Sequence, residues 1–242
     1  MSRVVFPYRD DKPHARMRLF CVPYAGGAAS LYRLWGKVLG PSIEVVPVEL
    51  PGRGTRMNEA PLNDLPRLVE GLAAAMRPVL DKPYALFGHS MGAKVAFELA
   101  RALLAHRPPT HLFVSASMAP QLPDPRLPFD LSTEGIIAEL RERGGTPPEV
   151  FEEPELLDIF LPIIRADFDL LGRYEFAPGP PLALPVTAFG GTRDPEITLD
   201  DVAAWKGNAG STFRMVPIEG DHFFIAAQQR ELLAEIATDL AR

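Results

Sequence analysis

A lone serine stands between two glycines in the stretch GHSMG, which spans residues 88–92. This spacing is typical of a nucleophile elbow, a strained turn between a strand and a helix that exposes the serine hydroxyl. The N-terminus of the following helix favours negative charge that develops at such a turn. A pentapeptide this short also occurs by chance, so its weight comes from the apolar run before it and the helical pattern after it. The sequence therefore predicts Ser90 as a nucleophile.

A serine hydroxyl attacks efficiently only when a general base takes its proton. The best candidate among the five histidines is His222, because it follows the last predicted strand and precedes the last predicted helix. That position places it on a loop at the carboxyl edge of the sheet, where sheets of this kind bind ligands. The side chain of His89, inside the elbow, is expected to point away from that of Ser90. The other histidines are interpreted as solvated surface residues: His14, His106 and His111.

An acid that orients the base should follow another strand, between the serine and the histidine in the chain. Asp194 satisfies both conditions, because it comes directly after the apolar run and two glycines of LPVTAFGGTRDPE. Glu196 is the fallback, two residues further on. Asp221 is adjacent to His222, but the side chains of neighbouring residues diverge, so it is a poor orienter.

Two backbone N–H groups should stabilise the oxyanion that forms on the attacked carbonyl. One donor is predicted at Met91, directly after the nucleophile. The other is predicted at Ala25 in the loop VPYAGGAAS, where Gly26 and Gly27 allow the backbone to approach a substrate. Tyr24 is the alternative donor, and a plain glycine turn between strand and helix is the structural alternative.

Two further residues could attract a functional interpretation. Cys21 is the only cysteine and lies within an apolar strand pattern, so a buried thiol is expected and no internal disulfide is possible. Arg53 lies in the Gly/Pro loop ELPGRG and is interpreted as a surface arginine on a turn. A chain with a single cysteine fits a reducing, cytoplasmic compartment.

Composition excludes several classes of protein. A formal net charge of −6 over 242 residues argues against a general nucleic-acid binder, which needs a basic surface. The N-terminal residues carry charges throughout, which argues against a secretory signal. No stretch approaches the roughly 18 uninterrupted apolar residues of a membrane helix. We therefore expect contact with neither nucleic acid nor membrane, and a monomer is the default expectation.

Apolar runs and helical patterns alternate along the chain. Continuous apolar strands separated by helices predict a mostly parallel sheet with helices on both faces. Strands are expected at 17–24, 43–50, 83–88, 110–117, 184–191 and 212–220. Helices are expected at 30–40, with Ser30 as its N-cap, at 62–80, with a later start because of Pro66, at 91–106 and at 223–242.

The alternation stops between residues 124 and 175, where helical patterns stand between proline-rich loops. We therefore expect a helical lid insertion at 124–175 in an α/β core formed by residues 1–123 and 176–242. Phe160, Ile163, Ile164, Phe168 and Leu171 recur at helical spacing, which is typical of a packed helix face.

Six stretches together resemble the discrete type II thioesterases of polyketide and nonribosomal peptide synthesis. They are LFCVPYAGGAASLYRLW, VVPVELPGRGTR, YALFGHSMGAKVAFELA, LPIIRADFDLLGRYEF, PVTAFGGTRDPEIT and IEGDHFFI. The resemblance implies an α/β-hydrolase fold with a mobile lid, a triad of Ser90, Asp194 and His222, and an oxyanion hole at Ala25 and Met91. It implies hydrolysis of acyl groups from the phosphopantetheine arm of acyl or peptidyl carrier domains, usually as an editing reaction, with no cofactor or metal of the enzyme's own.

Other functions remain open at the level of sequence. Medium-chain fatty acyl thioesterases share most of these features, and a small-ester esterase would use the same triad. Acyl transfer could replace hydrolysis, and a protein that binds carriers without catalysis could keep the fold. A basic surface for an acidic carrier is expected at Arg141 and Arg143, or at Arg53 and Arg56.

Overall fold

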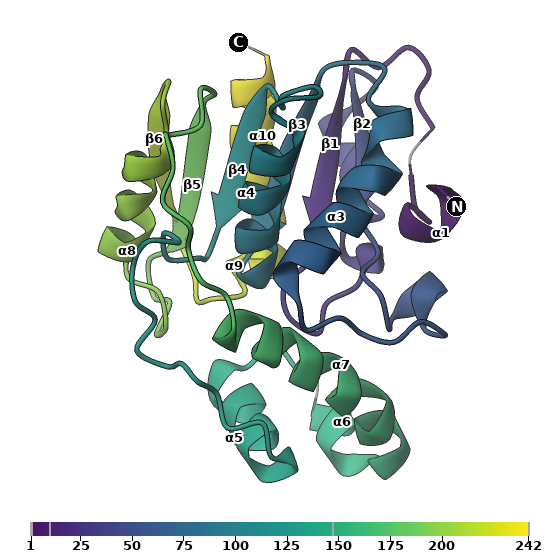
Figure 1. Ribbon diagram of the computed structural model, residues 1–242, viewed down its shortest axis with the longest axis vertical. Helices are drawn as coiled ribbons and strands as arrows, with labels where there is room; N and C mark the ends of the chain where they lie inside the picture. Colours follow the sequence, from purple (N-terminus) through teal and green to yellow (C-terminus); the bar gives the residue numbers. More distant parts are fainter. Residues whose placement is uncertain (1, 10, 147, 242) are drawn as a thin grey trace.

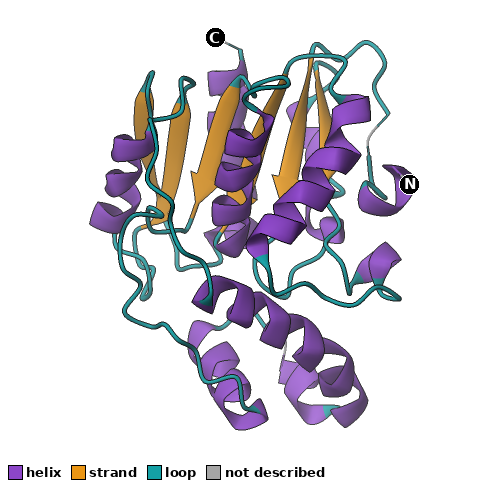
Figure 2. Cartoon of the chain, in the orientation of Figure 1, coloured by secondary structure: helices purple, strands orange, loops and turns teal. Residues whose placement is uncertain are grey.

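The computed structural model describes residues 2–9, 11–146 and 148–241, and its centre is a sheet of six strands (Figures 1 and 2). The strand order is β2-β1-β3-β4-β5-β6, and every neighbouring pair is parallel. The strands are β1 Met17–Val22, β2 Ile43–Pro47, β3 Tyr84–His89, β4 His111–Ser115, β5 Val186–Gly191 and β6 Phe213–Ile218. Parallel pairing brings all six carboxyl ends to one edge, which confirms the predicted α/β class.

Helices cover both faces of this sheet (Figure 1). One apolar cluster joins the sheet to α3 (Leu65–Met76), α4 (Met91–Leu103) and α8 (Leu199–Ala203). A second cluster joins the opposite face to α2 (Trp35–Leu39) and α10 (Gln229–Leu240). Every residue of β2, β3, β4 and β5 is buried, which explains why their sequences are apolar without alternation.

Two of the predicted helices begin later than the sequence pattern suggests. Asp64 caps α3 by accepting a hydrogen bond from the backbone of Arg67, and Pro66 lies in the first turn, where its missing N–H costs nothing. The predicted role of Ser30 as an N-cap is wrong, because Ser30 lies inside a 3₁₀ turn, η1 (Ala29–Tyr32), and α2 begins only at Trp35. The remaining short elements are α1 Ser2–Val5, η2 Gly54–Arg56, η3 Arg77–Val79, η4 Ala204–Asn208 and α9 Phe224–Ala227.

Three helices between β4 and β5 lie beyond the carboxyl edge of the sheet (Figure 1). They are α5 Thr133–Arg143, α6 Pro148–Glu152 and α7 Pro154–Gly172. Helices α5 and α7 share a small apolar cluster of their own, centred on Ile136, Ile164 and Phe168. Leu171 joins the main core, so α7 connects the two clusters. Residue 147, within the predicted lid, lies outside the described residues.

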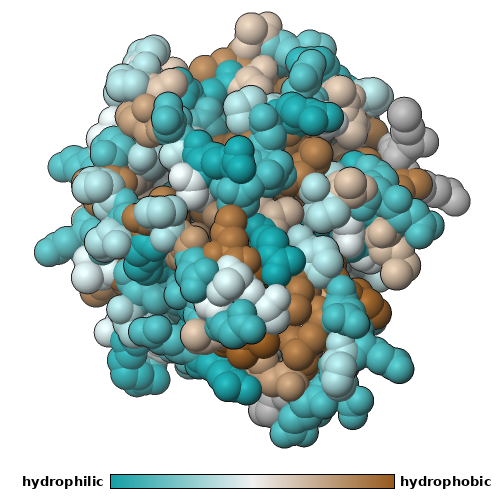
Figure 3. Space-filling view, turned by 60° about the horizontal axis from the view of Figure 1, so that its bottom comes forward, coloured by the Kyte–Doolittle hydropathy of each residue, from teal (hydrophilic) through white to brown (hydrophobic). Residues whose placement is uncertain are grey.

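One side of α7 is left to solvent. Four members of its predicted packed face are buried, namely Ile163, Ile164, Phe168 and Leu171, and the fifth, Phe160, is half-buried against the lid cluster. Leu156 and Ile159, near the start of the helix, are exposed. On this end of the molecule, apolar side chains form patches between hydrophilic ones (Figure 3). The lid helices therefore present both kinds of surface to the outside.

Two sequence interpretations are tested by burial. Cys21 is buried in β1, as expected, and burial raises the pKa of its thiol well above the ordinary range. The interpretation of His111 as a surface residue is wrong, because only 8% of it is exposed. Its ring stacks on Phe113 with centroids 4.1 Å apart, and its Nε2 lies 2.9 Å from the hydroxyl of Thr187. His111 is thus a packed residue at the amino edge of the sheet.

Candidate active site

Ser90 lies on a sharp turn between β3 and α4. Its φ of 54° and ψ of −120° are strained for a residue with a side chain, and this is the conformation that lifts a hydroxyl off the end of a strand. The two glycines of the motif are required by close packing. A Cβ at Gly88 would lie 2.0 Å from the carbonyl oxygen of Gly92, and one at Gly92 would lie 2.3 Å from that of Val22. Glycine at both positions is therefore a requirement of this turn.

Three side chains from separate loops meet at this turn. His222 Nε2 lies 3.0 Å from Ser90 Oγ, and His222 Nδ1 lies 2.8 Å from Asp194 Oδ2. The side chains of His222 and Asp194 are 3% and 0% exposed, so water competes little for these bonds. With Nδ1–H donating to the carboxylate, Nε2 is free to accept the serine proton. This arrangement is that of a serine nucleophile with a general base and its orienting acid.

The two alternative acids lie elsewhere. Glu196 forms ion pairs with Arg126 and Arg143. Asp221 accepts a hydrogen bond from the backbone N–H of Phe223 at 2.8 Å. Of the three carboxylates considered from the sequence, the structure thus brings only Asp194 to His222.

The surroundings of Asp194 favour its charged form. Burial by itself would raise the pKa of this carboxyl, but the hydrogen bond and the charge of His222 outweigh burial, and the net pKa is lowered. The backbone N–H groups of Glu196 and Ile197 donate to Oδ1 at 2.9 and 3.1 Å. Oδ1 is therefore committed to two backbone donors, and Oδ2 is left for the histidine.

His89 supports the base from behind, a role that the sequence did not reveal. Its side chain is fully buried; Nε2 lies 2.8 Å from the carbonyl oxygen of His222, and Nδ1 lies 2.9 Å from Ser115 Oγ. A carbonyl only accepts, so Nε2 carries the proton and Nδ1 accepts from the serine hydroxyl. Burial first, and then the charge of His222, lower the pKa of His89 to about 3.

The pKa of His89 predicts acid sensitivity. Its ordinary pKa of 6.5 applies to the unfolded chain, so between pH 6.5 and about 3 the unfolded state binds a proton that the folded state does not. As the pH decreases through this window, His89 alone should lower the free energy of unfolding by up to about 1.4 kcal/mol for each pH unit. Urea denaturation of wild type and His89→Gln at pH 7, 6 and 5 measures this slope. Equal slopes for the two proteins would contradict the assignment.

The predicted oxyanion donors flank Ser90. Ala25 lines a small cavity together with Ser90 and His222, and Tyr24 lines the same cavity. Met91 is the first residue of α4 and lines a second small cavity that also reaches Ser90. Gly26, next to Ala25, has a φ of +76°, which explains the need for glycine at that position of the loop.

The lid helices close over this site. The two cavities that reach Ser90 have volumes of about 40 and 20 Å³, enough for a few waters but far too little for an acyl chain. Arg143 of α5 lines both cavities and forms an ion pair with Glu196 at 2.7 Å. Glu196 also pairs with Arg126, while its other oxygen has no hydrogen-bond partner among the described residues. With α5 in this position, the space at Ser90 does not admit an acyl chain.

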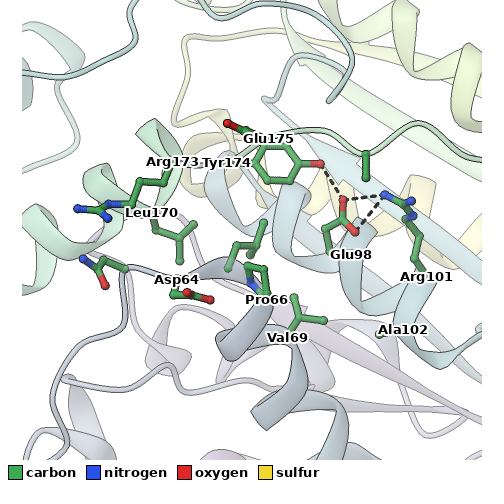
Figure 4. A pocket seen from close by; sticks show the side chains of 13 residues that line it. Asp64, Pro66, Val69, Glu98, Arg101, Ala102, Leu170, Arg173, Tyr174 and Glu175 are labelled. Carbon is green, nitrogen blue, oxygen red and sulfur yellow. Dashed lines mark hydrogen bonds and ion pairs between the residues drawn. The ribbon is translucent and has the colours of Figure 1, made fainter.

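A much larger hollow lies away from the catalytic residues. It has a volume of about 720 Å³ and lies between α3, α4 and the end of α7 (Figure 4). The charged groups drawn in its wall are paired, because Glu98 accepts hydrogen bonds from Arg101 and from the hydroxyl of Tyr174. Cavity size alone would therefore misplace the active site. The hydrogen-bonded Ser90, His222 and Asp194 place it at the smaller cavities.

Two absences apply to residues 2–9, 11–146 and 148–241. Within them, His, Cys, Asp and Glu side chains nowhere gather in groups of three or more that could hold a metal ion. In the same ranges, no helix combines the length and apolar character that crossing a membrane requires.

Comparisons with known proteins give a consistent result. The family described as "Thioesterase domain" matches residues 17–240. The gramicidin S biosynthesis protein GrsT of Aneurinibacillus migulanus is 40% identical over 222 residues, 90% of this chain and 87% of GrsT. The medium-chain S-acyl fatty acid synthase thioesterase of Rattus norvegicus is 33% identical over 234 residues, 91% of this chain and 86% of the rat protein. Among solved structures, the RedJ thioesterase from the prodiginine biosynthetic pathway in Streptomyces coelicolor is 39% identical with a TM-score of 0.88, covering 94% of this chain and 92% of RedJ.

Proposed function

The chain belongs to the thioesterase domain family and is a serine hydrolase of acyl thioesters, and we propose that it removes acyl groups from the phosphopantetheine arms of carrier domains. The observation that carries this proposal is the hydrogen-bonded series from Ser90 through His222 to Asp194 within an α/β-hydrolase fold. The acyl group would belong to a polyketide or nonribosomal peptide assembly line, where the enzyme edits stalled or incorrect intermediates.

The proposed reaction has two halves. Ser90 Oγ attacks the thioester carbonyl while His222 Nε2 takes its proton, and Asp194 stabilises the resulting imidazolium. The carbonyl oxygen becomes an oxyanion held by the N–H groups of Ala25 and Met91. Collapse breaks the C–S bond, the imidazolium of His222 gives its proton to the sulfur, and the thiol leaves easily because its pKa is near 8.5. Water then attacks the acyl-serine while the neutral His222 takes a proton from it. Collapse breaks the ester bond, His222 returns that proton to Ser90 Oγ, and the free carboxylic acid departs.

The assembly-line setting is supported by the named relatives. GrsT is named for gramicidin S biosynthesis, and RedJ comes from the prodiginine pathway. The match covers 87% of GrsT and 92% of RedJ. The carrier domain is then the partner and carries the phosphopantetheine, so the enzyme needs no cofactor or metal of its own. We propose a monomer in the cytoplasm that contacts neither nucleic acid nor membrane.

A second candidate function is hydrolysis of medium-chain fatty acyl thioesters. The rat thioesterase named for that activity is 33% identical to this chain, less than GrsT. The chemistry at Ser90 would be the same, and the difference would lie in the acyl chain and the carrier.

Three of the four arginines expected to form a basic surface for the carrier are paired with carboxylates. Arg53 is 5% exposed and forms an ion pair with Asp167, so it is a core residue and its interpretation as a surface arginine is wrong. The side chain of Arg143 is 11% exposed and pairs with Glu196 at 2.7 Å. Arg56 pairs with Glu59. Among the four expected arginines, Arg141 is the one that remains exposed on α5.

The proposal is tested by comparing substrates that share one acyl group. We expect kcat/KM for an acyl-loaded carrier domain to exceed that for the p-nitrophenyl ester of the same acid by about tenfold or more, because contacts to the arm and the carrier contribute binding energy. Intact mass spectrometry of the carrier follows loss of the acyl group. An acyl thioester of N-acetylcysteamine is the control for the arm without the carrier. A preference for the ester would favour the small-ester esterase instead.

A further inference from the structure

A buried ion pair joins the lid to a loop at the sheet edge. Arg53, just before η2, and Asp167, on α7, are 5% and 2% exposed. The pairing is bidentate, with Arg53 Nη1 donating to Asp167 Oδ2 at 2.7 Å and Nη2 donating to Oδ1 at 2.8 Å. The two residues are 114 positions apart in the chain. A pair of this geometry fixes both side chains tightly, because each guanidinium N–H meets its own oxygen.

The same pair holds the loop that carries the predicted oxyanion donor. Asp167 Oδ2 also accepts a hydrogen bond from the backbone N–H of Gly26 at 2.7 Å. Arg53 Nη1 also donates to the carbonyl oxygen of Gly27 at 3.2 Å. The loop is thus held at two consecutive residues, once by the carboxylate and once by the guanidinium.

These contacts determine the direction of the N–H of Ala25. The N–H of Gly27 donates to the carbonyl oxygen of Tyr24 at 2.9 Å, so that carbonyl is fixed by the turn. In a planar trans peptide the next N–H points the opposite way from the carbonyl, and this N–H belongs to Ala25. Holding Gly26 and Gly27 in place therefore holds the donor at Ala25 in place.

A second carboxylate holds the far end of the loop. Glu49, which is 1% exposed, accepts a hydrogen bond from the backbone N–H of Ala29 at 3.0 Å. The residue that follows Arg53 makes room for this group, because a Cβ at Gly54 would lie 2.0 Å from a Glu49 carboxylate oxygen. The loop is therefore held by Asp167 and Arg53 at one end and by Glu49 at the other.

We propose that Arg53 and Asp167 are positioning residues for the oxyanion hole, and that they tie its geometry to the place of lid helix α7. Neither side chain touches the reacting atoms. They act by holding the turn of Tyr24–Gly27, so that the N–H of Ala25 points at the oxygen that becomes negative. This inference rests on the proposed function of Ser90 as an acyl-transfer nucleophile.

The test separates positioning from folding through two inhibitors with the same acyl chain. A trifluoromethyl ketone is attacked by Ser90 Oγ, whose proton passes to His222, and its oxygen becomes an oxyanion in the hole. The free carboxylic acid binds the same chamber without forming that adduct. In Asp167→Ala we expect kcat/KM to fall about 100-fold, with KM within threefold, because one oxyanion donor is misplaced. The inhibition constant of the ketone should rise about as much, and that of the acid should stay within threefold.

Two further variants keep the test meaningful if the single variant unfolds. Arg53→Met/Asp167→Leu removes both charges, so it leaves no unpaired buried charge and should regain the melting temperature. It should still show the weakened ketone binding, since the side-chain bonds to the N–H of Gly26 and the carbonyl oxygen of Gly27 are lost. Arg53→Lys keeps the charge without the bidentate geometry and should fall between wild type and Arg53→Met.

The matched control is a buried ion pair at the opposite edge of the sheet. Arg18 and Glu44 lie near the starts of β1 and β2, are 3% and 1% exposed, and are joined at 2.9 Å. Glu44→Gln should lower the melting temperature without changing the ratio of the two inhibition constants. A folded Arg53→Met/Asp167→Leu enzyme with the wild-type ratio would overturn the proposal. Ketone binding tests the pair even if the wild-type enzyme hydrolyses no carrier thioester, so failure of the proposed function is recognised separately.

Discussion

Ser90→Ala should lower kcat for thioester hydrolysis by at least about 10⁴-fold, because it removes the hydroxyl that lies beside His222 and would form the acyl-enzyme. His222 would remain beside Asp194 but would have no serine proton to accept. Alanine at this position also relieves little of the turn's strain, since the φ of 54° stays unfavourable for any residue with a Cβ. We therefore expect the fold and the melting temperature to stay close to those of wild type.

The measurement is the release of free thiol from an acyl thioester, followed over hours for the variant. Ser42→Ala is the matched control, because Ser42 is exposed just before β2 and should leave the rate unchanged. Labelling with a fluorophosphonate should occur in wild type and in Ser42→Ala and be lost in Ser90→Ala. Turnover by Ser90→Ala within tenfold of wild type would refute the nucleophile.

Asp194→Asn should lower kcat by about 10⁴-fold while leaving the shape of the site intact. The reason lies in the two backbone donors that face Asp194 Oδ1, from Glu196 and Ile197. In the asparagine variant the amide oxygen satisfies these donors, so the NH₂ group points at His222. The histidine must then accept at Nδ1 and carry its proton on Nε2. In that tautomer it takes no proton from Ser90.

The control for this experiment is the neighbouring acid. Asp221→Asn changes a carboxylate next to His222 in sequence, but that side chain caps the backbone of Phe223 instead of the imidazole. We expect its kcat to stay within about threefold of wild type. Steady-state rates on one acyl thioester at pH 7.5 compare the two variants. Equal losses in both would mean that charge near the site matters more than the tautomer.

The strands and the positions of the three reacting side chains follow from local patterns. A strand buried on both faces, such as β3, is a continuous apolar run, and such a run can be recognised in the sequence. Parallel pairing then sends every strand end to one edge, so Ser90, Asp194 and His222 converge even though 132 residues separate the first from the last. Asp194 is preferred over Glu196 because it comes sooner after the strand, and the structure places it against the histidine.

The supporting contacts could not be predicted in the same way. Arg53 looks like any arginine in a glycine-rich turn, and its partner lies 114 residues away on a lid helix. His89 and His111 are buried by neighbours from distant segments. The sequence indicated a surface position for His111 and no role for His89. Such contacts depend on side-chain packing between elements, which no local pattern encodes. The same holds for the size of the cavity at Ser90, because Leu140 and Arg143 of α5 form part of its wall.

The last helix places the end of the chain on the side of the sheet away from the catalytic edge. Helix α10 starts shortly after His222, and its final residues, Asp239 and Leu240, line a hollow with the first residues of β1, β4, β5 and β6. Figure 1 shows the C-terminus and the lid helices at opposite ends of the molecule. A tag, a surface linker or a fused protein joined after α10 would therefore leave the approach to Ser90 clear. Immobilised or fluorescently labelled enzyme made in this way should still accept partners as large as itself.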